Sequence, residues 1–323
     1  MQNDSIELSF LSTFAFLTFF IFLLTNKFSH KIKNGILLDN DFSKPQAFHI
    51  NPISRSGGIA SIISLVLFIG IYNLLFSSFL FEYFFLSISL FSIGYLDDIK
   101  INISPNKRLI LMVIFLLVFI NINSIEIKHL EHNDLNFLNS ILKNNFFSSI
   151  FILLCFLFII NGANLVDGFN GLLTINMIII NVTLLFINLN NSQIEFSFFL
   201  TGQIIILIAF LLFNFPNAKM FLGDSGAYLF GSLVALNTII TNNLNSGMSS
   251  YFFCILLFYL FFEVFFSFFR KIYQNKSPIH PDRNHLHMLC HIRISQILNS
   301  KNSNYMTSVI INLIYSILVI PSL

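Results

Sequence analysis

Long apolar segments separated by short polar loops constrain this chain more than any other feature. Hydrophobic residues make up 55% of the sequence and charged residues only 10%, and the mean hydropathy is +0.79. Because a soluble globule carries about 25% charged residues, most of this surface must face lipid. Lipid cannot satisfy open backbone groups, so the apolar segments should be helices. Ten segments are predicted to cross the membrane: 6–25, 57–76, 79–96, 108–123, 147–163, 172–189, 197–214, 226–241, 250–270 and 304–321.

The predicted fold class is therefore all-α, a polytopic integral membrane protein with about ten transmembrane helices (ten to eleven). Most segments reach the roughly 17–25 residues needed to cross a bilayer, and two or three are shorter. The sequence shows neither an internal repeat nor a long linker. We therefore expect a single membrane-embedded domain over residues 1–323.

Basic residues orient the predicted spans. The spans place five loops on one side: 26–56, 97–107, 164–171, 215–225 and 271–303. That side, counted with its span ends, holds 15 of the 17 Lys and Arg residues, and the other side holds only Lys128 and Lys143. Because cytoplasmic loops carry the excess of Lys and Arg, the first side is predicted to be cytoplasmic and both termini extracytoplasmic.

Two adjacent carboxylates, Asp97 and Asp98, stand where the apolar segment 79–96 ends. Like charges side by side repel unless something neutralises them, and Mg²⁺ prefers carboxylate oxygens. One interpretation is a metal-dependent site at the membrane surface. The other is a helix end that simply reaches water.

The segment NGANLVDGFNGLL, residues 161–173, gathers polar side chains between two predicted spans. Asn164, Asp167 and Asn170 recur every third residue, which would bring them near one face of a helical turn. Polar groups at this depth are costly without a ligand or a polar partner. The segment is either a ligand site or a polar turn that caps two helices.

A third polar segment, NFPNAKMFLGDSGAYLFG, covers residues 214–231 and places Asp224 just before a predicted helix. Asp224 is either a helix cap or a functional carboxylate. The GDSG string also occurs around the serine of trypsin-like proteases. We reject that interpretation because this chain is a helical membrane protein and the string continues with AYLF.

Basic and imidazole side chains gather in KSPIHPDRNHLHMLCHIR, residues 276–293. Arg283, His285 and His287 suit phosphate oxygens. A zinc site is an alternative, because His287 and His291 are four residues apart, and a solvated surface is another.

Two further positions stand out. Arg55 precedes Gly57–Gly58 at the start of the second span, where a helix N-terminus suits an anion, although a basic topological anchor would look the same. Glu263 lies in mid-span, which by default indicates function. The sequence assigns no role to Glu263.

Taken together, the order and common side of these segments resemble the polyprenyl-phosphate N-acetylhexosamine-1-phosphate transferase family, from about Lys44 to His287. The family elements N-x-x-D-G-x-[DN]-G-L, [FM]-[LM]-G-D-x-G and P-D-R-x-H-x-H match residues 164–172, 221–226 and 281–287. Asn170 stands where many relatives have a second Asp, and Met288 where many have a third His. These departures favour the glycan-initiating branch over the peptidoglycan enzyme.

The resemblance implies roles for the matching residues. It implies Mg²⁺, with Mn²⁺ as an alternative, held by Asp224 with Asp98 and Asp167. Asp97, Asp98 and Asp167 would be catalytic, and Asp97 would either deprotonate the acceptor phosphate or form a covalent phosphoryl intermediate. The implied substrate-binding residues are Asn164, Asn170, Asn214, Phe221, Arg283, His285, His287 and Arg55.

The implied reaction transfers HexNAc-1-phosphate from a UDP-HexNAc, UDP-GlcNAc or a derived sugar, to undecaprenyl phosphate. It releases UMP and starts a lipid-linked glycan such as O-antigen or capsule, at cytoplasmic loops of the bacterial inner membrane. One alternative is phospho-N-acetylmuramoyl-pentapeptide transferase. Another is a transporter or flippase, which would place acids deep within its spans. The net charge of +2 indicates no nucleic-acid partner, and a homodimer remains open.

Overall fold

The computed structural model describes residues 2–29, 31, 35–40, 52–101, 103–128, 130, 136–277, 284–298 and 300–322. Most of these residues are helical, as predicted. The elements in chain order are α1 (Gln2–Ser29), β1 (Leu38–Asp39), β2 (Ile53–Ser54), α2 (Gly57–Phe76), α3 (Phe81–Asp98), α4 (Pro105–Ile122), α5 (Asn136–Leu142), α6 (Asn145–Val166), α7 (Leu172–Asn190), α8 (Ile194–Asn214), α9 (Gly223–Leu244), α10 (Ser250–Leu256), α11 (Phe258–Tyr273), α12 (Leu286–Ile297), α13 (Ser300–Val319) and a final 3₁₀ turn, Ile320–Ser322.

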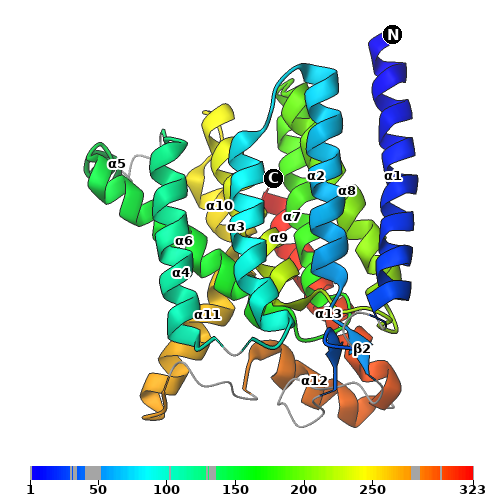
Figure 1. The fold of residues 1–323 in the computed structure, drawn as a ribbon. Coiled ribbons are helices and arrows are strands. Elements are labelled where there is room, and N and C mark those ends of the chain that lie inside the picture. Colours follow the sequence, from blue (N-terminus) through cyan, green and yellow to red (C-terminus); the bar gives the residue numbers. More distant parts are fainter. Residues whose placement is uncertain are drawn as a thin grey trace.

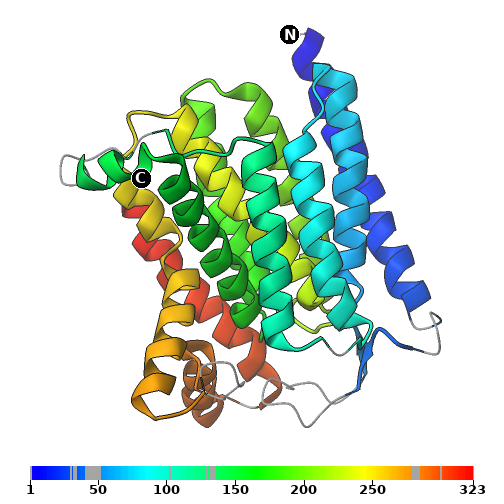
Figure 2. The ribbon, with the colours of Figure 1, turned by 60° about the vertical axis from the view of Figure 1, so that its left-hand side comes forward.

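The long helices lie side by side in one bundle (Figures 1 and 2). Helix α12 and strand β2 lie at the end of the bundle opposite the N-terminus (Figure 1). The two strands form a small antiparallel pair in which Leu38 lies opposite Ser54 and Asp39 opposite Ile53. This pair is a minor departure from the predicted all-α fold, and it lies at the end of the bundle that carries the site.

The chain is a multi-pass membrane protein, but the predicted count of ten spans is not confirmed. Among the described residues, six helices are long and apolar enough to cross a bilayer: α1 (its part from Leu8), α2, α4, α6, α7 and α8. Helices α10 and α11 make a seventh if this pair, bent by 66°, counts as one span. Segments 79–96, 226–241 and 304–321 are also helical, as α3, α9 and α13. These helices are less apolar, because α3 includes three acids and α9 and α13 contain many Ser, Thr and Asn side chains.

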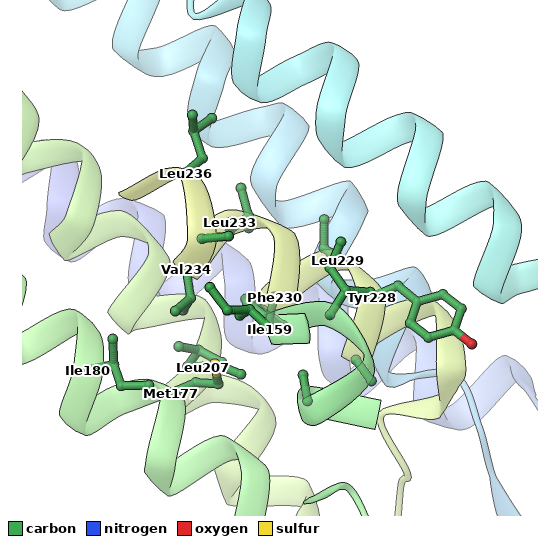
Figure 3. Packing of buried hydrophobic residues seen from close by; sticks show 14 of the residues in the cluster. Ile159, Met177, Ile180, Leu207, Tyr228, Leu229, Phe230, Leu233, Val234 and Leu236 are labelled. Atoms are coloured by element: carbon green, nitrogen blue, oxygen red, sulfur yellow. The ribbon is translucent and has the colours of Figure 1, made fainter. Parts of the chain in front are cut away.

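Helix α9 is the buried axis of the bundle. Its residues are buried along nearly the whole helix, and it packs most extensively against α3 and α6. Figure 3 shows Phe230 and Val234 of α9 among Ile159 of α6, Met177 of α7 and Leu207 of α8. Because lipid tails are as apolar as these side chains, close van der Waals packing rather than removal from water holds such helices together.

Polar side chains inside the bundle fix the register of four helices. Asn237 on α9 donates through Nδ2 to Oδ1 of Asn181 on α7 at 2.9 Å and to Oε1 of Gln203 on α8 at 2.8 Å. Tyr83 on α3 donates its hydroxyl to Asn237 Oδ1 at 2.7 Å. Hydrogen bonds between membrane helices contribute about 0.6–2 kcal/mol each. They therefore help to hold the first turn of α9 at a fixed height beside α3.

A glycine sets the distance between α3 and α9. A Cβ atom on Gly94 would lie 2.5 Å from the backbone of Asp224 and Ser225, so only glycine lets the two helices approach this closely. The contact brings the carboxyl end of α3, with Asp97 and Asp98, against the amino end of α9. Two motifs 126 residues apart thereby meet.

Candidate active site

Asp98 holds the first turn of α9. Its Oδ1 accepts a hydrogen bond from the backbone N–H of Asp224 at 3.0 Å, and its Oδ2 accepts one from Ser225 at 3.0 Å. The Asp98 side chain is completely buried. A carboxylate at this position satisfies two open amides and interacts favourably with the helix dipole. The predicted catalytic and metal-binding roles of Asp98 remain predictions, and its observed contacts attach α9 to α3.

Asp97 and Asp224 converge on one cationic nitrogen. Nη1 of Arg108, in the first turn of α4, lies 3.0 Å from Asp97 Oδ2 and 2.9 Å from Asp224 Oδ2. The three side chains are between 20% and 30% exposed, so solvent reaches them. Asp224 is therefore not the cap of its own helix, because Asp98 has that role. The Asp224 carboxylate is directed to the point that it shares with Asp97.

The strand pair brings Arg55 to the same place. Arg55 donates through Nη2 and Nε to Asp39 Oδ2 at 2.7 and 3.2 Å, and its Nη1 lies 3.8 Å from Asp98 Oδ1. The backbone N–H groups of Gly57 and Gly58 donate to the carbonyls of Phe221 and Leu222. These two amides at the start of α2 are thus used within the fold. The Arg55 guanidinium is paired with Asp39, so its contact with a substrate anion stays a prediction.

The polar motif at 164–170 does not form one helical face, and that prediction is wrong. Helix α6 ends at Val166, so Asn164 lies in its last turn while Asp167 and Asn170 lie in the turn that follows. Asn170 donates through Nδ2 to the carbonyl of Pro216 at 2.9 Å. This side chain therefore ties the turn to the loop before α9.

Asn214 completes that connection. Its Oδ1 accepts from the backbone N–H of Gly171 at 2.6 Å, and its Nδ2 donates to the carbonyl of Met220 at 2.9 Å. Both ends of the amide are engaged with backbone, so its predicted substrate contact remains a prediction. Phe221 lies half-buried in the same loop.

Asp167 lies in the electrostatic field of the acid cluster. Burial, and then the negative charge of Asp224, raise the pKa of Asp167 to about 7, while Arg55 lowers it. A carboxyl group with such a pKa exchanges a proton near neutral pH. Asp167 is therefore suited to proton transfer or to binding a cation.

His285 and His287 are buried beside Glu263. Glu263 Oε2 lies 3.2 Å from His285 Nδ1, and Glu263 Oε1 lies 3.0 Å from His287 Nδ1. The ring of His287 meets Phe169 edge-on, with centroids 5.5 Å apart, so the histidine pair reaches the turn after α6. Arg283 lies outside the described residues.

The alternative of a zinc site has no support in the described part of the chain. No three His, Cys, Asp or Glu side chains there are placed to hold a metal ion together. Nδ1 of His291 instead faces the hydroxyl of Thr307 at 3.5 Å. Mg²⁺ is a different case, because it is usually bound by one or two carboxylates and substrate phosphates. Asp97 and Asp224, which already share one cationic atom, fit that requirement.

The predicted site omits two residues that contact its members in the structure. Arg108 follows the Asp97–Asp98 pair as a basic residue at the start of the next span. Glu263 is an acid in mid-span, so its sequence signal is visible, but its partners lie 22 and 24 residues away. Neither partnership follows a short sequence spacing.

The structure is a helical membrane bundle with acids, arginines and histidines gathered at one end, and these side-chain types suit phosphate and cations. The profile of glycosyl transferase family 4 matches residues 80–242, which run from α3 to α9. This chain belongs to that family, and it is a multi-pass membrane transferase.

Individual relatives agree with this assignment. The chain is 26% identical over 270 residues to undecaprenyl-phosphate alpha-N-acetylglucosaminyl 1-phosphate transferase of Thermotoga maritima. The aligned region covers 82% of this chain and 77% of that protein. It is 27% identical over 224 residues to phospho-N-acetylmuramoyl-pentapeptide-transferase of Streptococcus sanguinis, covering 66% and 67%. The enzyme of that name from Prochlorococcus marinus is 29% identical over 242 residues, covering 69% and 66%.

Proposed function

We propose that this protein transfers HexNAc-1-phosphate from a UDP-HexNAc to undecaprenyl phosphate and releases UMP. The convergence of Asp97 and Asp224 on one cationic atom, near Asp167 and with Arg55 against Asp98, supports the proposal most directly. Such a cluster suits a diphosphate with a bound cation. The name of the Thermotoga relative, which covers most of the chain, supports the same reaction.

In this reaction an oxygen of the lipid phosphate attacks the phosphorus that carries the sugar. The new P–O bond forms as the bond to the UMP oxygen breaks, and UMP leaves with the electron pair. Such transfers depend mainly on positioning and charge neutralisation. Mg²⁺, or Mn²⁺, would be held by Asp224 and Asp97, with Asp167 nearby, and would neutralise charge on the diphosphate.

The chain's own residues would position and neutralise the reactants. Arg55 and Arg108 supply guanidinium donors for phosphate oxygens. Asp98 holds Asp224 in place through the first turn of α9. The carboxylate of Asp167, with its raised pKa, is suited to accept a proton from the acceptor phosphate.

We favour direct attack by the lipid phosphate over a covalent phosphoryl intermediate. Asp97 is paired with Arg108, and both oxygens of Asp98 accept hydrogen bonds from backbone amides. A carboxylate engaged in this way is a weaker nucleophile because its charge is already stabilised. A covalent aspartyl phosphate trapped during turnover would contradict this preference.

The sugar is the least constrained part of the proposal. Asn170 and Met288 favour the glycan-initiating branch, whereas several relatives carry the name phospho-N-acetylmuramoyl-pentapeptide-transferase. That reaction is therefore the second candidate. The two differ in the donor, so a donor panel separates them.

The test uses purified protein, undecaprenyl phosphate and Mg²⁺, and measures UMP released from UDP-GlcNAc, UDP-GalNAc and UDP-MurNAc-pentapeptide. We expect release from a UDP-HexNAc and a loss of about 10³-fold in Asp224→Asn, because that variant removes charge from the proposed cation site. Glu82→Gln, at the far end of α3, is the matched control. Absence of UMP release from every donor would overturn the proposal.

A further inference from the structure

Glu263 is a fully buried carboxylate in the helix α11. An acid in the membrane-embedded part of a protein is costly, and it is usually paired inside the bundle. The contacts of Glu263 are therefore more informative than those of a surface acid. They come from α11 itself and from the start of α12.

Both oxygens of this carboxylate face imidazole rings. Oε2 lies 3.2 Å from His285 Nδ1, and Oε1 lies 3.0 Å from His287 Nδ1. The backbone N–H of His287 also donates to Oε1 at 3.4 Å, and the hydroxyl of Tyr259 donates to it at 3.5 Å. An ionised carboxylate only accepts hydrogen bonds, so each Nδ1 must carry the hydrogen. The Nε2 edge of each ring is then the edge directed away from Glu263.

The Nε2 atom of His287 lies against the turn that follows α6. A Cβ atom on Gly168 would lie 3.1 Å from it, so the absence of a side chain at Gly168 leaves room beside this nitrogen. Within the described residues, His287 Nε2 is buried and makes no hydrogen bond. An unsatisfied buried polar atom costs about 1–3 kcal/mol. Such an atom beside the Asp167–Gly168 motif indicates a partner that arrives with the substrate.

The two rings act as one unit. His285 and His287 stack with their centroids 5.4 Å apart and their planes at 11°. Phe169 also packs edge-on against the ring of His287. The ring of His287 is therefore fixed by Glu263, His285 and Phe169, and among the described residues its Nε2 has no hydrogen-bond partner and remains for a ligand.

We propose that Glu263 is a positioning residue that holds His285 and His287 with Nδ1–H toward itself and presents His287 Nε2 to a phosphate oxygen of the substrate. A proton on Nε2 makes the ring an imidazolium whose charge the carboxylate offsets, and Nε2–H then donates to the phosphate. The identity of that ligand rests on the proposed function. The orientation of the rings does not.

The ring orientation can be measured without activity. We would label the imidazole nitrogens with ¹⁵N in the full-length protein and assign His285 and His287 with single His→Gln variants. In the wild type, Nδ1 of both rings should be protonated. Rings protonated only on Nε2 would overturn the proposal.

Variants of Glu263 supply the second measurement. In Glu263→Gln the amide offers one acceptor and one donor, so one of the two rings should lose its Nδ1–H. The kcat of this variant should fall about 10–100-fold, and Glu263→Asp should recover part of the loss. Unchanged tautomers, or unchanged kcat with a folded variant, would contradict the proposal.

Two controls separate the possible failures. Glu82→Gln removes a different acid of the helical bundle, at the far end of α3, and should leave both the ¹⁵N pattern and kcat unchanged. If Glu263→Gln does not fold, the wild-type tautomers alone decide. If the wild type releases no UMP from any donor, the proposed function fails, whereas the tautomer measurement still tests the role of Glu263.

Discussion

The acid half of the site (Asp97, Asp98, Asp224 and Arg108) and the histidine half (Glu263, His285 and His287) differ in how their charges are paired and exposed. In the acid half, Asp97 and Asp224 share one nitrogen of Arg108, and all three side chains are partly exposed. In the histidine half, one fully buried carboxylate faces two imidazole rings and uses both of its oxygens. The acid half has more acceptors than cationic donors and is open to water. We therefore expect a metal ion bound in the acid half to exchange with solvent, whereas the histidine pair is held in place by Glu263.

The largest combined effect on stability and activity should come from Asp98, the residue that connects the acid half to the fold. Asp98→Asn places an amide NH₂ against one of two backbone N–H groups, so a charged hydrogen bond is lost and two donors face each other. We expect a loss of about 1.5–3 kcal/mol and a melting temperature lower by several degrees. Because Asp224 shifts with its helix, kcat should also fall about 10²-fold.

Thermal unfolding in detergent and UMP release measure the two effects of Asp98→Asn. The matched variant Asp224→Asn should lose activity while it keeps its melting temperature. A normal melting temperature in Asp98→Asn would show that its contact with α9 contributes little.

A variant of Arg108 tests whether a divalent metal ion can replace the guanidinium between Asp97 and Asp224. In Arg108→Gln the two carboxylates lose their shared guanidinium, so an added divalent ion no longer competes with it. We expect Mn²⁺ to bind about tenfold more tightly, which corresponds to about 1.4 kcal/mol. Calorimetric titration of the wild type and the variant measures this. Weaker binding would mean that Arg108 helps to form the ion site.

The pH dependence of stability follows from Asp167 and Asp97. In the folded state the pKa of Asp167 is raised from 3.8 to about 7, and burial and then the charge of Asp224 raise that of Asp97 to about 6. Each carboxyl group therefore contributes stability below about pH 4 that is lost as pH rises through its folded-state pKa. Mg²⁺ favours the ionised form and should offset that loss. The increase in melting temperature on adding Mg²⁺ should therefore be larger at pH 8 than at pH 5.5. An equal increase at both values would exclude Asp167 from the ion site.

The smallest effect should come from Gly168→Ala in the histidine half. The new methyl group would lie 3.1 Å from His287 Nε2, and the neighbours must move by a few tenths of an ångström. Because Glu263 and Phe169 hold the ring, we expect kcat to fall by less than about tenfold. Steady-state kinetics measure the effect. A loss as large as that of Asp98→Asn would show that catalysis depends on the close approach of Gly168 to His287 as strongly as on the contact of Asp98 with α9.

The sequence predicts much of this arrangement, because hydrophobic segments and short motifs are local properties. Every predicted span is mostly helical, although 250–270 is divided into α10 and α11. Asp97 and Asp98 meet Asp224 at one end of the bundle, and the charge of Asp224 raises the pKa of Asp167. The number of spans is less certain from sequence, since α3 and α9 are buried helices that tolerate polar residues. The helical face predicted for Asn164, Asp167 and Asn170 fails because α6 ends at Val166.

By itself, the sequence determined the membrane class, the helical fold and the family, because each depends on apolar length or on motifs within a few residues. Only the tertiary structure decided which side chains share a charge. Asp98 caps α9, Arg108 joins Asp97 to Asp224, and Glu263 faces two histidines. In the sequence these partners lie between 11 residues apart, for Asp97 and Arg108, and 127 residues apart, for Asp98 and Ser225. Their pairing depends on how the helices pack, which no local spacing encodes.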